Sequence, residues 1–250
     1  MLNNQTMRNE AVSSSGVTPI SYRIVTIPKF AGDDTVSNTP LSLARKFRDF
    51  RLLALKTSPG AFASTYEDES QRSIDHTFER LRNTKATHFV AVAVAVADAL
   101  DDDLACEANT NDLLQLDWLG TVVLMGPNHD SRSISAKADP FAQMASRDDQ
   151  VATAKGHEAL HFHLNGMFVQ PSARRCGMGR RLIEAALGRA REKCASSDLK
   201  SIHCTIIVDE WNDSARSLYA GCGFEVVATE IYGDNRVAIR MELREAGERA

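Results

Sequence analysis

Residues 169–187, VQPSARRCGMGRRLIEAAL, place two closely spaced glycines between a strand-like run and an amphipathic segment. The apolar, β-branched and aromatic residues that precede them predict a strand over 161–169. After them, apolar side chains recur at spacings of four, three and four residues, which predicts a helix over 180–195. Gly177 and Gly179 therefore fall in a turn between a strand and a helix.

The composition of this turn favours the binding of an anion. Glycines let backbone N–H groups approach a ligand without a Cβ in the way, and the first N–H groups of a helix are unpaired at the positive end of its dipole. Positive charge is added there by Arg174, Arg175, Arg180 and Arg181. Arginines in the first turn oppose the helix dipole, so they cost stability unless an anion lies nearby. The turn predicts a phosphate-binding site, and a tight basic turn without a ligand is the alternative.

The remaining periodicity predicts an α/β fold. Strands are expected at 22–27, 89–97, 118–125, 161–169, 201–208, 224–232 and 236–243. Helices are expected from a Thr39-Pro40 cap to Ser58, and at 70–81, 180–195 and 212–220, the last ended by Gly221 at its C′ position. The strand–helix–strand unit around residue 180 implies a crossover, and residues 233–235 suit a hairpin turn. The order predicts a mixed sheet with helices on both faces.

Composition excludes several classes of function. The formal net charge is -4, which argues against bulk affinity for nucleic acid, and no apolar run is long enough to cross a membrane. Residues 1–19 are polar and read as a disordered leader. The five cysteines are odd in number and form no CxxC pair, so we expect free thiols in a reducing compartment, the cytoplasm or the nucleus.

Two segments carry a resemblance to a known family. The stretch 169–187 resembles the acetyl-CoA-binding segment of the GNAT superfamily of N-acetyltransferases, whose signature is Arg/Gln-x-x-Gly-x-Gly/Ala. Residues 212–233, NDSARSLYAGCGFEVVATEIYG, resemble its second signature, Asn-x-x-Ala…Leu-Tyr-x-x-x-Gly-Phe. Residues 45–70, RKFRDFRLLALKTSPGAFASTYEDES, are similar to the paired first helices of many members.

The resemblance implies one acetyltransferase domain over residues 20–245. Its fold would be a mixed, mostly antiparallel GNAT-type sheet flanked by helices on both faces. Polar insertions at about 98–117 and 126–160 interrupt a region that the family usually joins by short turns. Acetyl-CoA would lie where the neighbouring parallel strands 161–169 and 201–208 splay apart.

The resemblance also implies roles for individual residues. The backbone of Met167, Phe168 and Val169 would pair with the pantetheine amides, and Asn212 would bond the pantetheine arm or simply cap a helix. Tyr219 would protonate the leaving thiolate, unless it is only a core tyrosine. The pyrophosphate would be held by Arg174, Arg175, Cys176, Gly177, Met178, Gly179 and Arg180.

The acceptor is expected to be a primary amine on a small molecule or a peptide. Its pKa of about 10.4 leaves almost all of it protonated at pH 7, so transfer requires a base. His163 falls where several members carry a catalytic glutamate, and its alternative role is that of a strand histidine on a half-exposed face. Other candidate bases are Asp209, Glu210, Glu158 and an ordered water. The acidic run Glu67-Asp68-Glu69 is either a site for a cationic acceptor or a solvated loop.

Two other functions remain as alternatives. The domain could bind acyl-CoA without catalysis. Residues 157–161, HEALH, match the zinc-binding HExxH motif of metalloproteases, with His163 as a further nitrogen. That motif requires a helix, which conflicts with the strand expected from His161, so no metal is expected. The sequence gives no indication of oligomeric state.

Overall fold

The computed structural model describes residues 21–30, 38–95, 106–107, 109–128, 159–199, 201–232 and 235–246. The expected leader 1–19, parts of both insertions, the motif residues His157 and Glu158, and the hairpin residues 233–234 lie outside the described residues.

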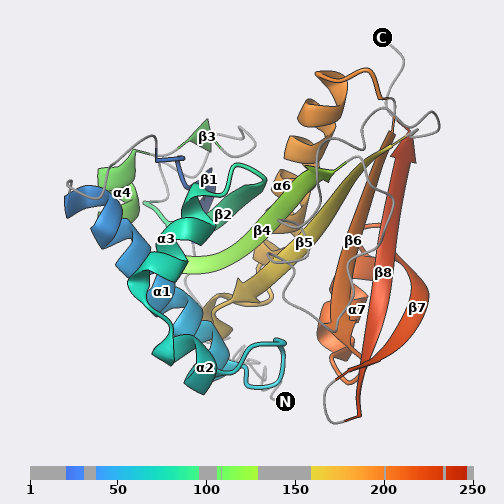
Figure 1. The fold of residues 1–250 in the computed structure, drawn as a ribbon, viewed down its shortest axis with the longest axis horizontal. Coiled ribbons are helices and arrows are strands. Elements are labelled where there is room, and N and C mark those ends of the chain that lie inside the picture. The colour runs from blue at the N-terminus through green and yellow to red at the C-terminus, as the bar shows by residue number, and fades with distance from the viewer. Residues whose placement is uncertain are drawn as a thin grey trace, which may run out of the picture.

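Eight strands form one sheet in the described part of the chain, in the order β3-β1-β2-β4-β5-β6-β8-β7 (Figure 1). Neighbouring strands are antiparallel except for β5 with β6 and the short β3 with β1. The predicted mixed, mostly antiparallel sheet is therefore confirmed. The strands are β1 (Tyr22–Thr26), β2 (Ala86–Ala93), β3 (Cys106–Glu107), β4 (Trp118–Asn128), β5 (Leu160–Val169), β6 (Ser201–Asp209), β7 (Glu225–Tyr232) and β8 (Arg236–Ala246).

Helices cover both faces of this sheet, as predicted. The described helices are α1 (Asn38–Thr57), α2 (Tyr66–Gln71), α3 (Ile74–Arg82), α4 (Thr110–Gln115), α6 (Met178–Ala195) and α7 (Asp213–Ala220). Figure 1 shows α1 to α4 together on one face, where α1 and α3 bury Val90 and Val92 of β2. Helices α6 and α7 lie on the other face, over Leu164 of β5 and Ile206 of β6. None of the described helices combines the length and apolarity that crossing a membrane requires.

Several predicted boundaries were wrong. The helix expected at 70–81 is two helices, because Ser73 accepts a hydrogen bond from the backbone N–H of His76 and caps a new start. Strand β4 continues to Asn128, so the second insertion begins later than residue 126. Gly221 is right-handed at the end of α7, with φ of -66°, and the left-handed glycine is Gly223 with φ of 92°.

Strand β5 contains a bulge that separates it from β6. The two strands pair in parallel from Leu160 with Ile202 to Leu164 with Ile206, and no further. The register with β4 then shifts by one residue, and Gly166 adopts a φ of 61°. Because a bulge bends its strand and reverses the side-chain alternation, Leu164 and Phe168 belong to opposite hydrophobic clusters. The bulge thus produces the splay that was predicted between these strands.

Candidate active site

A cavity of about 1500 Å³ opens at the splay between β5 and β6. Its walls come from the end of β5, the end of β6, the starts of α6 and α7, and the α1–α2 loop at residues 58–64. The predicted site residues that line it are His163, Met167, Phe168, Val169, Arg174, Arg175, Gly177, Met178, Gly179, Arg180, Asn212 and Tyr219. Cys176 is not among them, and its thiol donates instead to the carbonyl of Ala173 at 3.0 Å.

The end of β5 presents one backbone edge to the cavity. Residues 165–169 keep β4 on one side but have lost β6 on the other. An extended segment could therefore pair with this edge as an added strand does. The Phe168 side chain is 4 % exposed and packs on Phe50 with ring centroids 5.7 Å apart, so only its backbone can serve a ligand.

The glycine turn ends at the first residues of α6. The earliest helical hydrogen bond runs from the N–H of Arg181 to the carbonyl of Gly177 at 3.1 Å, so the N–H groups of residues 178–180 have no acceptor within the helix. Gly177 has a φ of 81°, and a Cβ there would meet no atom within 4 Å. Met178 is 1 % exposed, so its contribution is also limited to its backbone. N–H groups at a helix start can bind an anion, which is the role that the sequence predicted for this turn.

Gly179 also has a packing role that the sequence did not predict. A Cβ at this position would lie 3.0 Å from Cδ2 of Leu218 on α7 and 3.3 Å from Cε of Met167 on β5. The sequence predicted Gly179 as part of a phosphate-binding turn, where a glycine lets backbone N–H groups approach an anion. The structure places Gly179 in the cavity wall and adds that the glycine allows α6, α7 and β5 to pack closely.

Two arginines of the turn, Arg174 and Arg180, form hydrogen bonds with different parts of the fold. Arg174 donates through Nε to the carbonyl of Val169 at 2.9 Å and through Nη2 to Ser58 at 3.2 Å, which links β5 to the α1–α2 loop. Arg180 donates to the carbonyl of Gly221 at 2.8 Å. Because that carbonyl lies at the negative end of α7, it offsets the unfavourable charge of Arg180 at the start of α6. Arg180 thus stabilises the fold as well as lining the cavity.

Two predicted residues of α7 face the same cavity. Asn212 is the N-cap, and its Oδ1 accepts a hydrogen bond from the N–H of Ala215 at 3.2 Å, so the capping role is confirmed. Tyr219 is 5 % exposed, and its hydroxyl forms no hydrogen bond with another described residue. Burial, with a smaller contribution from Cys222, raises the pKa of Tyr219 above its ordinary value of 10.0. The hydroxyl therefore keeps its proton at neutral pH and can act as a donor.

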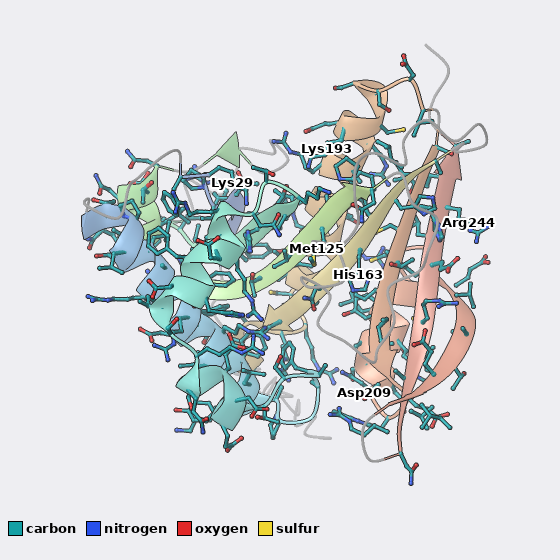
Figure 2. All side chains as sticks on the ribbon, viewed as in Figure 1. Lys29, Met125, His163, Lys193, Asp209 and Arg244 are labelled. Atoms are coloured by element: carbon teal, nitrogen blue, oxygen red, sulfur yellow. The ribbon has the colours of Figure 1, made fainter. Side chains whose placement is uncertain are left out.

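The candidate bases differ in their burial, their partners and their distance from the cavity. His163 lines the cavity and is 2 % exposed rather than half-exposed, with its Nδ1 at 2.9 Å from Oγ1 of Thr205. Asp209 also lines the cavity, at the end of β6 (Figure 2), but its carboxylate is 2.6 Å from the guanidinium of Arg236. Glu210 is exposed and lies outside the cavity wall, and Glu158 lies outside the described residues.

The acidic run Glu67-Asp68-Glu69 belongs to helix α2 rather than to a solvated loop, and its carboxylates have different surroundings. Glu69 is 2 % exposed and lies 3.2 Å from Arg51 and 2.9 Å from Arg80. Its charge is therefore used to hold α1, α2 and α3 together. Asp68 lines the cavity and accepts a hydrogen bond from the hydroxyl of Thr65 at 2.8 Å.

Three further cavity or loop residues had not been predicted. Arg51 and Trp211 line the cavity, and Trp211 is 60 % exposed there. Arg236 reaches the loop carbonyls of Gly60 and Phe62 from β8. Their positions depend on chain segments that are distant in sequence, and the only local signal is an exposed tryptophan beside a motif asparagine.

The second histidine of the HExxH motif lies in a strand rather than in a helix. His161 lies in β5, so the two motif histidines cannot share the face of one helix. Its Nδ1 is 3.0 Å from Nδ1 of His203 on β6. No group of three metal-ligating side chains occurs among the residues that the structure describes.

Comparisons with known proteins agree with this geometry. Residues 130–245 match the family model of the acetyltransferase (GNAT) domain. Among solved structures, an acetyltransferase of the GNAT family from Streptococcus pneumoniae is similar, at 13 % identity and a TM-score of 0.50, with 91 % of this chain and 99 % of that chain covered. No curated protein sequence matches the chain significantly.

Two further solved structures are also similar. Spermidine N-acetyltransferase from Vibrio cholerae, in complex with CoA and spermine, is 15 % identical over 90 % of this chain and 95 % of that chain, with a TM-score of 0.47. Arabidopsis thaliana NAA60, in complex with acetyl-CoA, is 12 % identical over 90 % and 98 %, with a TM-score of 0.48. The family match spans β5, the glycine turn, α6, β6 and α7. Residues 130–245 are therefore similar to the acetyltransferase (GNAT) domain, and the chain has the fold of the Streptococcus pneumoniae acetyltransferase.

Proposed function

We propose that this protein is an acetyl-CoA-dependent N-acetyltransferase that transfers the acetyl group directly to a primary amine in a ternary complex. One observation carries the proposal. The cavity at the splay brings together the open edge of β5, the helix start at residues 177–180 and the hydroxyl of Tyr219. These are a strand partner, an anion cradle and a proton donor, which are the three groups that an acyl-CoA transferase needs.

The residues present fit acetyl-CoA. The N–H groups at the start of α6 suit its pyrophosphate, and the unpaired edge of residues 165–169 suits its pantetheine amides. Bound there, acetyl-CoA would supply an activated acyl group as a thioester. The arginines Arg174 and Arg175 lie at the same mouth of the cavity and favour an anionic ligand.

The remaining chemistry is assigned to two side chains. His163 removes a proton from the acceptor ammonium, because only the neutral amine is nucleophilic. Tyr219 donates its proton to the sulfur as the C–S bond breaks, and its raised pKa keeps that proton in place until then. The phenolate then takes up the second proton that the nitrogen loses as the amide forms. The acceptor enters beside the α1–α2 loop, where Arg51 and Trp211 line the wall.

An acetylation assay over a broad panel of primary amines and peptides, with detection of the released thiol, tests the proposal. We expect thiol release that depends on both acetyl-CoA and the acceptor, and a mass increase of one acetyl group on the acceptor. The competing function is an acyl-CoA-binding module. Tight acetyl-CoA binding by calorimetry without turnover of any amine in the panel would favour that alternative.

A further inference from the structure

We propose that Thr205 is a positioning residue that fixes the tautomer of His163, placing the proton on Nδ1 and the lone pair on Nε2. The inference deepens the proposed function, because it rests on His163 as the base of the acetyl transfer. It concerns the protonation of one ring nitrogen, which can be measured in the protein without any substrate.

The sheet places the two residues side by side. In the parallel pairing of β5 with β6, His163 stands opposite Thr205, one step before the last pair at the splay. Thr205 Oγ1 is 2.9 Å from Nδ1 of His163 and 3.3 Å from the carbonyl oxygen of Phe162. The hydroxyl therefore has two neighbours, one on the base and one on the backbone of the same strand.

Counting protons shows which tautomer of His163 allows both hydrogen bonds to form at once. A carbonyl oxygen can only accept, and a threonine hydroxyl has a single proton to donate. With that proton directed to Phe162, Oγ1 can only accept from the histidine, so Nδ1 carries a proton. A neutral imidazole with a proton on Nδ1 has its lone pair on Nε2, which is the form that a general base requires.

Burial makes this arrangement stable. His163 is 2 % exposed and Thr205 is 5 % exposed, and buried polar groups need hydrogen-bond partners. The alternative tautomer would leave the Nδ1 lone pair and Oγ1 facing each other unless the hydroxyl turned away from Phe162. In either case the site keeps one hydrogen bond fewer than with the proton on Nδ1.

The test compares Thr205→Val with a matched control, Thr121→Val. Thr121 is also buried, and its hydroxyl donates to a strand carbonyl, that of Phe89 at 2.9 Å. Both variants therefore lose a buried hydroxyl bonded to a strand, but only Thr205→Val removes a partner of His163. Thr205→Ser keeps the hydroxyl and serves as the conservative rescue.

The first measurement is long-range proton–nitrogen NMR of histidine-labelled protein without substrate. We expect the wild type, Thr205→Ser and Thr121→Val to show His163 protonated at Nδ1, and Thr205→Val to show a mixture of tautomers. A wild-type His163 with a bare Nδ1, or identical His163 signals in Thr205→Val and Thr121→Val, would overturn the inference. If the wild type carries the proton on Nδ1 but acetylates no amine, the proposed function is wrong and the tautomer assignment is still correct.

The second measurement is steady-state kinetics. We expect Thr205→Val to lower kcat by about 10–100-fold, the usual effect of losing a group that orients a functional histidine, with the KM for acetyl-CoA unchanged. The acidic limb of the pH–kcat profile should move, because the neutral base is no longer held in one form. Equal kcat values for Thr205→Val and Thr121→Val would show that the hydroxyl has no positioning role.

Discussion

The guanidinium of Arg236 on β8 lies 2.6 Å from the carboxylate of Asp209 at the end of β6, and the same group donates to the carbonyl of Gly60 in the α1–α2 loop. One side chain therefore ties the α1–α2 loop to the end of the sheet at the splay. Asp209 is buried, so the loss of this ion pair would be unfavourable.

Replacing Arg236 should act mainly on the acceptor side. We expect Arg236→Ala to raise the KM for the amine about tenfold, equivalent to about 1.4 kcal/mol, with little change in acetyl-CoA affinity. Stability should fall by about 1–3 kcal/mol, less than for a fully buried pair because 35 % of the Arg236 side chain is exposed. Kinetics with each substrate varied in turn, together with thermal unfolding, would check this.

Arg244→Ala is the control, since Arg244 lies on the same strand and pairs with Glu242 away from the cavity. A rise in the acetyl-CoA KM equal to that for the amine would contradict the assignment of Arg236 to the acceptor loop.

Tyr219→Phe should separate catalysis from coenzyme binding. Removing the hydroxyl deletes the proton donor but leaves the buried ring, which packs on Phe224 at 6.2 Å between centroids. We expect kcat to fall by about 10²–10⁴-fold, with the Kd for acetyl-CoA from calorimetry unchanged. Tyr22→Phe, which removes a hydroxyl near the glycine turn, is the control. Equal losses in turnover and binding would make Tyr219 a structural residue.

The raised pKa of Tyr219 also predicts how the proposed acetyl transfer depends on pH in the alkaline range. An acid must be protonated to act, and burial raises the pKa of this hydroxyl above 10.0. Its activity is therefore fully present below pH 10 and is lost only as the pH rises through the higher folded value. We expect no descending limb of kcat between pH 7 and pH 10 at saturating amine. A descending limb in that range that disappears in Tyr219→Phe would refute the shift.

The two glycines of the turn should respond differently to alanine. At Gly177 the Cβ has room but φ is 81°, so Gly177→Ala should cost about 1–2 kcal/mol and Gly177→Asn less. At Gly179 the Cβ meets Leu218, so Gly179→Ala should cost about 1–3 kcal/mol and weaken acetyl-CoA binding. The cost of Gly179→Ala should shrink in a Leu218→Ala background, as a double-mutant cycle by denaturant unfolding would show. Additive effects would disprove the packing role.

Glu69 should make the stability depend on pH in the acid range. Burial raises the pKa of its carboxyl, but Arg51, Arg80 and Arg72 more than offset this, and the net pKa is lowered from 4.5. The stabilisation is thus complete above the unfolded pKa of about 4.5 and is lost as the pH falls through the lower folded value.

We therefore expect Glu69→Gln to cost about 3–5 kcal/mol at neutral pH and to flatten the loss of stability on acidification. Glu67→Gln, at an exposed position of the same helix, should change neither the stability at neutral pH nor its loss on acidification. Urea unfolding at several pH values would measure both. If Glu69→Gln lost stability on acidification as steeply as the wild type, Glu69 would not be the source of this pH dependence.

The cavity wall around the glycine turn and α7 could be predicted from sequence because its signals are local. The glycine turn and the period of α6 lie within twenty-seven residues, 169–195, and the second motif places Asn212 and Tyr219 on one short helix. The predicted parallel pair, the helices on both faces and the shared cavity follow from these elements.

The parts that were missed depend on single residues or on distant partners. A bulge at Gly166 changes the register by one residue without disturbing the apolar pattern. The role of Gly179 depends on Leu218 in another helix, and that of Arg236 on Asp209 across the sheet. The division of α2 from α3 follows from the cap at Ser73, which local periodicity does not reveal.

The contacts between α6 and α7 have a consequence for the order of binding. Gly179 packs on Leu218, and Arg180 donates a hydrogen bond to the carbonyl of Gly221, so the proposed phosphate cradle and Tyr219 are packed together as one body. Folding has already removed the conformational entropy that assembling these two groups would otherwise cost. The α1–α2 loop reaches this body through a few side chains, chiefly Arg174 and Arg236. We therefore expect ordered binding, in which acetyl-CoA binds first to a preformed site and the amine binds second.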